Sequence, residues 1–593
     1  MRLVGPRAPA PRHATVAHAL AAAAAHPSGV TFVDLSERET FVPWREVRER
    51  ATRAAGALAA RGVAPGDRVA IVLRTEPAFL DAFLGAWLAG AIPVPLYPPV
   101  RLGRMEEYLR STARMLAVAG ARLVVSSGAV RRLLGPAVAA AAPALGTISA
   151  DALLGGAPRA RSPDPGELAL VQFSSGSTVD PKPVALTHAA LQAQVDALLA
   201  EVRPDATDVL VSWLPLYHDM GLIGCLLGAL SYPGPLVLIP PEHFLARPAL
   251  WLRALARHRG TISAAPSFAY AYSAERVSPD ALRGLSLASW RFALDGAEPV
   301  SADAMRRFAA RFAPHGLDPG ALVPVYGLSE AALAVTFARR GAALAGRRID
   351  PVRLARDGVV APGTREVVSV GTPVSGVEVE VRDPRGAPLG EGRLGRIHAR
   401  GPSIMAGYLG DPDATRRAVV GGWLDTGDLG FVAGGELHVH GRAKDVVIVR
   451  GANHAPEEFE LALSAVPGLR AGCAVAVGLD VDGDERLAIL AERARAARDP
   501  DAALEERVRR AVLERTAIAP DTVRILAPGT LPRTSSGKLR RQESLRRLLA
   551  GTLAPPRRAS ALELAVAAAR GELAYARARL ARAPRPLDLD GEP

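Results

Sequence analysis

A hydroxyl-rich loop with one lysine is the first stretch of the chain whose residue types could do chemistry. Residues 174–188 read SSGSTVDPKPVALTH. Serine and threonine hydroxyls, backbone N–H groups around a glycine, and a lysine ammonium all bind phosphate oxygens. The loop is not a Walker A loop, because Gly-Lys-Ser/Thr is missing, and Val179 and Pro183 stand where glycine would be expected. A working nucleotide loop, a damaged one and an ordinary serine-rich turn are all compatible with this stretch alone.

The elements expected on either side of the loop are a strand over 167–173 and a helix over 186–202. The first turn of a helix presents free N–H groups and the positive end of its dipole. We therefore expect the loop and the start of this helix to face a phosphate together.

Lysine is rare in this chain, although basic residues are not. Lys182, Lys444 and Lys538 are the only lysines among 72 basic residues. An ammonium differs from a guanidinium in shape, hydration and donor geometry, so a position that keeps lysine is a candidate for chemistry that arginine cannot perform. Chance survival is the alternative for any single lysine, but each of the three falls in a motif-like context.

Four further stretches place polar residues at turns, and each alone is more often structural than functional. They are WLPLYHDMGLIG (213–224, with His218), RFALDGAEPV (291–300, with Asp295, Gly296 and Ala297), VYGLSEAAL (325–333, with Tyr326, Gly327 and Glu330) and WLDTGDLGF (423–431, with Asp428). Their order and spacing together favour a site.

Short apolar runs that alternate with helical patterns must position these turns. Expected buried strands lie at 67–73, 121–127, 208–215 and 236–240. Such alternation predicts parallel sheets covered by helices, on which ligands bind at the C-terminal strand ends. From about Gly371, polar and apolar residues alternate as in a smaller β-rich part, over 377–383, 395–401 and 436–442.

These patterns predict an α/β protein with a large N-terminal domain and a small C-terminal domain. The N-terminal domain (1–443) should contain two α/β subdomains with parallel-rich sheets and a small β-rich subdomain. A compact α+β domain (444–548) and a helical, polar tail (549–593) should follow, because 593 residues exceed a single core.

Composition limits the classes of function. The net charge of +12 and the pI near 10.3 would suggest nucleic acid, but the arginines are spread along the chain and few aromatic residues accompany them, so we expect no nucleic-acid partner. The apolar stretch 222–239 is interrupted by Gly224, Gly228, Pro233 and Pro235, and it is expected to be buried core rather than a membrane span. Cys225 and Cys473 form no metal pattern, and a reducing cytoplasm is expected.

The motif series resembles the adenylate-forming superfamily of acyl-CoA synthetases, peptide-synthetase adenylation domains and luciferases. Over roughly residues 14–548 it looks most like the fatty acyl-AMP ligases, also through RGANHAPEEFE (450–460) and LPRTSSGKLRR (531–541). That subgroup carries an insertion after its Tyr-Gly-Glu motif. Gly371 follows Glu330 by 41 positions, a length that suggests the insertion here.

The resemblance implies ATP and Mg²⁺ as cofactors, a fatty acid as substrate, and a role for each motif. The departing phosphates would be held by Lys182 together with Ser174, Ser175, Gly176, Ser177 and Thr178, and Mg²⁺ would be bound by Glu330 with help from Thr178. The ribose would be held by Asp428 and Arg442, and the adenine would be enclosed by Gly296, Ala297, Tyr326 and Gly327, with Asp295 at its edge.

The resemblance also implies roles in the reaction and in domain movement. Lys538 would bridge the acyl oxygen and the α-phosphate, and Lys444 would be the hinge of a mobile C-terminal domain. His218 would lie near the carboxylate of the substrate, unless it caps a turn.

Three functions stay open for such a chain. The first is formation of an acyl-adenylate and transfer of the acyl group to the phosphopantetheine thiol of an acyl carrier protein or a polyketide or peptide synthase carrier domain. The second is an acyl-CoA synthetase that uses free CoA. The third is a non-catalytic adenylate-binding protein, which Val179 and Pro183 motivate because a valine side chain crowds phosphates and proline lacks an N–H.

Overall fold

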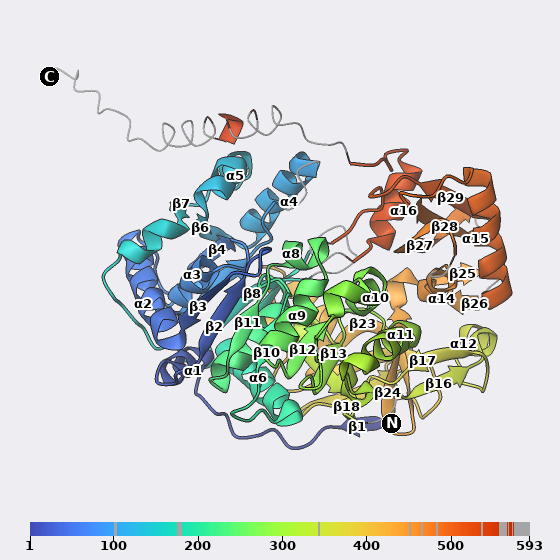
Figure 1. The fold of residues 1–593 in the computed structure, drawn as a ribbon, viewed down its shortest axis with the longest axis horizontal. Helices are drawn as coiled ribbons and strands as arrows, with labels where there is room; N and C mark the ends of the chain where they lie inside the picture. Colours follow the sequence, from blue (N-terminus) through green and yellow to red (C-terminus); the bar gives the residue numbers. More distant parts are fainter. Residues whose placement is uncertain are drawn as a thin grey trace. The chain divides into compact units, whose positions relative to one another are not determined.

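The computed structural model describes residues 1–99, 104–174, 181–341, 344–449, 452–463, 466–481, 484–534 and 538–556, together with Val566, Ala569, Arg570, Gly571 and Leu573. The chain forms two compact units (Figure 1). One comprises residues 1–48 and 162–556, and the other comprises residues 49–161 and 557–593. The predicted boundaries at residues 444 and 549 stay predictions.

The smaller unit contains a four-stranded parallel sheet in the order β5-β4-β6-β7. Its elements are α2 (Trp44–Ala60), β4 (Arg68–Val72), α3 (Pro77–Leu88), β5 (Ile92–Pro95), α4 (Met105–Val118), β6 (Ala121–Ser126), α5 (Gly128–Ala141) and β7 (Gly146–Ser149). Val69, Ile71 and Val124 are fully buried, as strands covered on both faces require. The strands predicted at 67–73 and 121–127 are confirmed.

The larger unit is built around a nine-stranded sheet in the order β18-β15-β14-β13-β12-β10-β11-β2-β3. The strands are β2 (Gly29–Val33), β3 (Glu39–Pro43), β10 (Leu210–Ser212), β11 (Leu236–Leu238), β12 (Ile262–Ala265), β13 (Phe292–Asp295), β14 (Leu322–Gly327), β15 (Ala334–Phe337) and β18 (Thr372–Pro373). The six strands from β14 to β2 are parallel. In Figure 1, α9 (Ala249–Arg257), α10 (Ser267–Arg276) and α11 (Ala302–Phe312) lie over β10, β12 and β13.

The predicted β-rich part is an antiparallel sheet. It contains β1 (Arg2–Val4), β19 (Glu378–Arg382), β20 (Gly395–Arg400), β22 (Val419–Val420), β23 (Trp423–Ala433) and β24 (Glu436–Arg442). The segment between Glu330 and Gly371 begins with β15 of the nine-stranded sheet; its later part forms a separate antiparallel pair, β16 (Gly346–Ile349) and β17 (Arg365–Val368), with α12 (Pro351–Asp357) between the two strands.

The hydroxyl-rich loop belongs to a β-hairpin, and the prediction that it leads directly into a helix was wrong. β8 (Leu168–Phe173) pairs antiparallel with β9 (Pro183–Thr187), which pairs with β21 (Gly407–Tyr408). Helix α6 (His188–Val202) begins only after β9, where the Thr187 hydroxyl accepts a hydrogen bond from the Ala190 N–H at 3.1 Å. Five strand residues span about 16 Å. The helix start therefore lies at the far end of β9 from Lys182.

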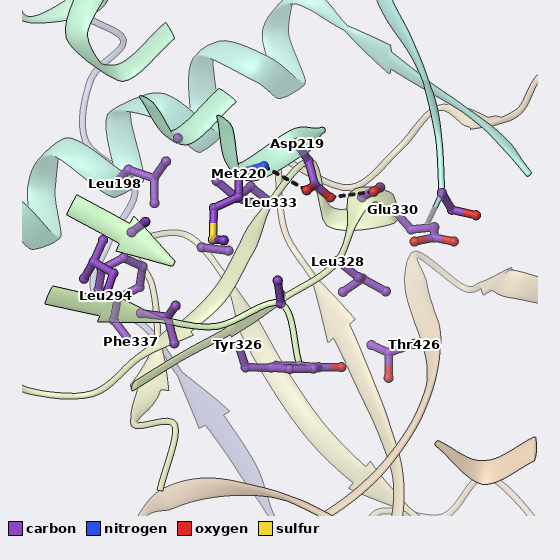
Figure 2. Close-up of a pocket in the computed structure, with 18 of the residues that line it drawn as sticks. Leu198, Asp219, Met220, Leu294, Tyr326, Leu328, Glu330, Leu333, Phe337 and Thr426 are labelled. Carbon is purple, nitrogen blue, oxygen red and sulfur yellow. Dashed lines mark hydrogen bonds between the residues drawn. The ribbon is translucent and has the colours of Figure 1, made fainter. Parts of the chain in front are cut away.

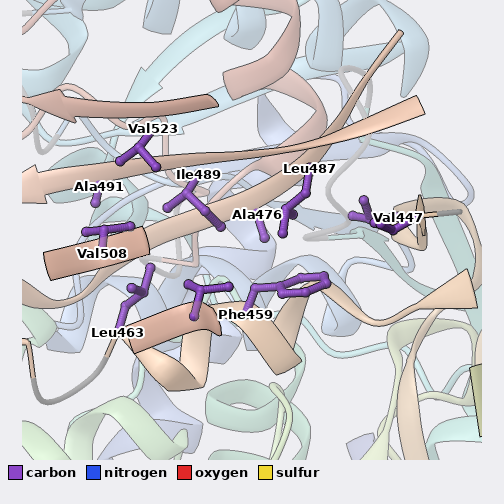
Figure 3. Packing of buried hydrophobic residues seen from close by; sticks show 11 residues of the cluster. Val447, Phe459, Leu463, Ala476, Leu487, Ile489, Ala491, Val508 and Val523 are labelled. Atoms are coloured by element: carbon purple, nitrogen blue, oxygen red, sulfur yellow. The ribbon is translucent and has the colours of Figure 1, made fainter. Parts of the chain in front are cut away.

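The chain beyond Lys444 has a hydrophobic core of its own (Figure 3). It contains β25 (Val447–Val449), β26 (Ala452–His454), α14 (Pro456–Ala462), β27 (Leu469–Val481), β28 (Asp484–Arg493), α15 (Asp501–Thr516), β29 (Thr522–Leu526) and α16 (Arg541–Leu549). Phe459, Ile489 and Val508 are fully buried in this core, where α14 and α15 pack against the β27–β28–β29 sheet.

The apolar stretch 222–239 is buried core, as predicted. It forms a π-helix (Met220–Leu227), the short helix α7 (Gly228–Ser231) and β11. Within the described residues, no helix is both long and apolar enough to cross a membrane.

Candidate active site

A cavity of about 540 Å³ runs from the C-terminal ends of β13 and β14 to the first residues of β10 and β12, and it has two chemically different ends (Figure 2). Its polar end is lined by Ser174, Lys182, Asp219, Tyr326, Glu330, Arg396, Tyr408, Arg417, Asp425, Arg442, Lys444 and Lys538. Its apolar end is lined by Leu198, Leu199, Val202, Leu210, Met220, Ile262, Leu294, Leu333 and Phe337. All three lysines of the chain therefore line one cavity.

Asp428 lies next to Tyr326 and Arg442, which come from different strands. The Tyr326 hydroxyl donates a hydrogen bond to Asp428 Oδ2 at 2.8 Å, and Arg442 Nε lies 3.3 Å from Oδ1. The β23–β24 register sets the second contact, because Asp428 and Arg442 are paired directly. Burial raises the pKa of the Asp428 carboxyl, and the Arg442 charge opposes that rise. Asp428 can thus offer acceptor oxygens to ligand hydroxyls.

Glu330 is held by a residue that the sequence did not single out. Glu330 lies on a short 3₁₀ turn (Ser329–Ala331), and its Oε1 accepts a hydrogen bond from the Tyr408 hydroxyl at 3.0 Å. The Lys182 ammonium lies 4.5 Å from the centre of the Tyr408 ring, within the range of a cation–π interaction. Tyr408 thus connects the lysine of the hairpin loop to the carboxylate.

The donor set suits Mg²⁺ bound together with phosphates. Mg²⁺ usually takes one or two carboxylates, several waters and phosphate oxygens, not a cage of protein ligands. Among the residues that the structure describes, no three His, Cys, Asp or Glu side chains gather as a metal cluster. Glu330, in a cavity rich in cations, fits this role.

Lys538 lines the cavity, and its backbone is hydrogen-bonded to Thr534. Its N–H donates to the Thr534 hydroxyl at 3.1 Å, its carbonyl accepts from the Thr534 N–H at 2.8 Å, and the Arg540 N–H donates to the Pro532 carbonyl at 3.0 Å. Burial lowers the pKa of the Lys538 ammonium, and the Asp219 charge opposes this effect. Of the described residues beyond Lys444, Lys538 alone lines this cavity.

His218 lies beside Asp219 at the start of the π-helix. The pKa of His218 is lowered to about 4, chiefly by burial; the Asp219 charge opposes this shift and the Lys538 charge adds to it. Asp219 accepts hydrogen bonds from the Ser329 hydroxyl at 2.5 Å and from the Met220 N–H at 2.8 Å. Whether His218 positions a substrate stays a prediction. Asp219 also lines the cavity, and nothing in its local sequence predicts this.

The hairpin loop is described only at its base. The Ser174 N–H donates to the Lys182 carbonyl at 2.9 Å, and the Lys182 N–H donates to Ser174 Oγ at 3.3 Å. Pro183 begins β9. Residues Ser175, Gly176, Ser177, Thr178 and Val179 lie outside the described residues.

The turn after β13 brings two backbones close together. A Cβ on Gly296 would lie 2.6 Å from Val325 Cγ2 and 2.9 Å from the Val325 carbonyl oxygen, so only glycine fits there. Ala297 has φ +71°, an uncommon value for a residue other than glycine, and lines the cavity. With Tyr326 and Gly327, Ala297 forms one wall of the cavity.

Asp295 is directed into the protein rather than the cavity. It is fully buried, and its Oδ2 accepts a hydrogen bond from the Ser267 hydroxyl at 2.6 Å. Burial raises the pKa of this carboxyl well above its ordinary value. Asp295 does not line the cavity, although its neighbour Ala297 does; its predicted contact with the adenine edge stays a prediction.

A second cavity of about 830 Å³ shares Ala297, Val325, Tyr326, Gly327, Arg442 and Lys538 with the first. It extends between α10 and α11 on one side and the chain beyond Lys444 on the other. Arg470 and Arg533 line its outer part. The polar end of the first cavity therefore has a second approach.

Comparison with known proteins identifies the family of the chain. A family model described as AMP-binding enzyme matches residues 20–409. The chain belongs to this AMP-binding enzyme family. A cavity that joins six cationic side chains to an apolar arm agrees with this assignment, since the cations suit phosphates.

The relatives and solved structures narrow the class to AMP-forming ligases. A putative acyl-CoA synthetase of Caulobacter vibrioides is 34% identical over 91% of this chain and 96% of its own length. The medium-chain-fatty-acid–[acyl-carrier-protein] ligase JamA of Moorena producens is 34% identical over 65% of this chain and 68% of its own length. A fatty acyl-adenylate ligase structure, from a study of the E. coli and L. pneumophila enzymes, superposes with a TM-score of 0.85 at 31% identity, over 91% of this chain and 98% of the other. The predicted family and fold class, and an ATP-using, AMP-forming ligase activity, are confirmed.

Proposed function

We propose that this enzyme joins a fatty acid to the α-phosphate of ATP and then passes the acyl group to the phosphopantetheine thiol of a carrier protein. One observation supports the first step, formation of the acyl-adenylate. A single cavity presents six cationic side chains at one end and an apolar arm at the other. An acyl-adenylate has that distribution of charge and apolar surface.

The proposed site residues divide the work between positioning and charge stabilisation. Ser174, Ser175, Gly176, Ser177, Thr178 and Lys182 hold the departing phosphates; Asp428 and Arg442 hold the ribose; Gly296, Ala297, Tyr326 and Gly327 enclose the adenine; Glu330, with Thr178, binds Mg²⁺. When bound, Mg²⁺ neutralises charge on the phosphate oxygens.

The reaction is an in-line displacement that needs no covalent nucleophile on the protein. A carboxylate oxygen of the fatty acid forms a bond to the α-phosphorus, while the bond from that phosphorus to the bridging oxygen of the β-phosphate breaks and pyrophosphate leaves. Lys538 stabilises the charge that develops between the acyl oxygen and the α-phosphate. His218 has its pKa lowered by burial and is therefore neutral at physiological pH, so it adds no positive charge there.

The acceptor is proposed to be a carrier protein rather than free CoA because of a buried contact that restrains the chain beyond Lys444. Arg365, at the start of β17, pairs with Glu458 of α14, and Glu458 Oε2 also lies 3.1 Å from His454 Nδ1. This pair joins the segment between Glu330 and Gly371 to the C-terminal part. A restrained C-terminal part disfavours transfer to a small diffusing thiol, whereas a protein that docks can supply binding energy to move it. JamA, a relative, is named as a carrier-protein ligase.

An acyl-CoA synthetase is the second candidate, because the Caulobacter relative carries that name. The test measures pyrophosphate exchange with a panel of fatty acids, followed by thioester formation on holo-carrier proteins and on CoA. We expect exchange with fatty acids and thioester on a carrier. Efficient acyl-CoA formation would reject the carrier proposal, and no exchange with any acid would favour a non-catalytic adenylate-binding protein.

A further inference from the structure

The apolar arm of the cavity ends at a wall that is tied in place. Tyr232 and Pro204 line its far end, and both are only half-buried, so they separate the arm from solvent. In Figure 2, Leu198, Leu294 and Phe337 lie on one side of the cavity, and Glu330 and Thr426 lie on the other.

A polar network outside the arm fixes this wall. The Tyr232 hydroxyl donates a hydrogen bond to the Asp208 carbonyl at 2.5 Å. The Asp208 carboxylate accepts from Arg291 Nε at 2.8 Å and from an Arg291 terminal nitrogen at 2.6 Å. That nitrogen also donates to the Val202 carbonyl at 3.2 Å, and Val202 lines the arm. The ring of Tyr232 is therefore held from outside.

Glycines give the arm its width along one side. Gly224 and Gly228 of the π-helix and α7 line the arm one helical turn apart. Gly228 has ordinary helical angles, φ −58° and ψ −54°, so its backbone does not require glycine. A Cβ on Gly228 would have one protein atom near it, the Ile223 carbonyl oxygen at 4.0 Å. A larger side chain at this position would occupy the arm.

No charged side chain lines the apolar arm beyond Met220 among the described residues. The polar atoms there are the tethered Tyr232 hydroxyl and the Cys225 thiol, which is neutral because burial raises its pKa to about 11. A second carboxylate at the far end of an acid would lose its hydration without gaining a partner.

We infer that Tyr232 and Gly228 set the length of the acid that this enzyme accepts, and that the arm takes an unbranched chain with an uncharged end. The inference rests on the proposed function. Each methylene that the arm buries should raise kcat/KM about fourfold (about 0.8 kcal/mol). The gain should stop where the chain reaches the Tyr232 ring, because an additional methylene has no space there.

The test measures kcat/KM for acyl-adenylate formation over a series of straight-chain acids that differ by two methylenes. In Gly228→Leu, the highest kcat/KM should be found for a shorter acid than in wild type. The kcat/KM of this variant for the shortest acid should stay within about threefold of the wild-type value. Tyr232→Ala should move the maximum to longer acids. Tyr232→Phe, which keeps the ring and loses the tether, is the matched control and should keep the wild-type maximum. An acid with a second carboxylate at its far end should react at least about 100-fold more slowly than the monoacid of equal length.

Three results would overturn the inference. In the first, the acid length with the highest kcat/KM is the same as in wild type in both Gly228→Leu and Tyr232→Ala. In the second, this length changes as much in Tyr232→Phe as in Tyr232→Ala, which would assign the effect to loosening of the hydrogen-bond network. Equal rates for the diacid and the monoacid would reject the uncharged end. Wild-type enzyme that activates no fatty acid would reject the proposed function itself, and active wild type with unmoved maxima would reject the inference alone.

Discussion

The ammonium of Lys538 lies among Asp219, Glu298 and Asp428, whose charges oppose the burial that lowers its pKa. Because this charge meets the α-phosphate in the proposed step, Lys538→Ala should reduce pyrophosphate exchange about 100-fold, or about 3 kcal/mol. Lys538→Arg should restore less than a tenth of the wild-type rate, since a planar guanidinium differs in shape and donor geometry. Arg510→Ala, on the exposed face of α15, is the control. Exchange in Lys538→Ala within threefold of wild type would contradict the assignment.

Tyr408 is predicted to orient Glu330 for the metal ion. Tyr408→Phe removes the hydroxyl that donates to Glu330 Oε1 but keeps the ring beneath Lys182. Loss of a hydrogen bond to a charged group should raise the Mg²⁺ concentration at half-maximal exchange about tenfold (about 1.4 kcal/mol) and change KM for the fatty acid little. Tyr408→Leu also removes the cation–π contact, so KM for ATP should rise as well. An unchanged Mg²⁺ dependence in Tyr408→Phe would separate Tyr408 from the metal.

His218 should make the fold less stable in acid. Burial lowers its pKa in the folded state from 6.5 to about 4, so the unfolded chain binds a proton that the folded chain refuses. This loss of stability begins as the pH falls through 6.5 and is complete below about pH 4. The free energy of unfolding of His218→Gln, measured by urea titration, should therefore fall less steeply than that of wild type across this window. Parallel curves for the two proteins would show that His218 is not buried in neutral form.

At the scale of elements, the β16–α12–β17 segment is predicted to restrain the C-terminal part through Arg365 and Glu458. Their side chains are 14% and 3% exposed, and breaking a buried pair leaves an uncompensated charge. Arg365→Met should weaken the restraint on the C-terminal part and raise the rate of acyl-CoA formation. The rate of pyrophosphate exchange should stay within about threefold of the wild-type rate. Arg365→Lys, which keeps the charge, should lie between Arg365→Met and wild type. No rise in acyl-CoA with Arg365→Met would remove the restraint as the basis of acceptor choice.

Local patterns in the sequence predicted the buried parallel strands well. A strand that is covered on both faces is a nearly continuous apolar run, and residues 67–73 form such a run. They did not reveal β9, since its five residues run directly into a helix and carry no turn of their own. Tyr408 was missed for a related reason. It lies on a two-residue strand whose partner is more than 200 positions earlier, and local periodicity carries no information on such pairing.

At the scale of the whole molecule, the three lysines are the clearest case of prediction from composition. Lys182, Lys444 and Lys538 are far apart in the sequence, and their rarity alone marked them. The structure brings all three to one cavity. Their distances from one another depend on long-range packing of the hairpin, of β24 and of the loop before α16, which no local pattern specifies.

The last prediction separates the charge of Lys444 from its place in the chain. Lys444 lies in a 3₁₀ turn (Ala443–Asp445) between β24 and β25, and burial together with Arg442 lowers its pKa. Lys444→Ala and Lys444→Pro both remove the ammonium, but proline also fixes φ near −65°, a value that a 3₁₀ turn accommodates. If the C-terminal part rotates about this residue, pyrophosphate exchange should be equal in the two variants. Transfer of the acyl group to the carrier should be about 100-fold slower in Lys444→Pro than in Lys444→Ala, because the proline backbone can no longer leave the described conformation. Stopped-flow or quenched transfer from preformed acyl-adenylate measures this second step alone. Equal transfer rates in the two variants would place the hinge elsewhere.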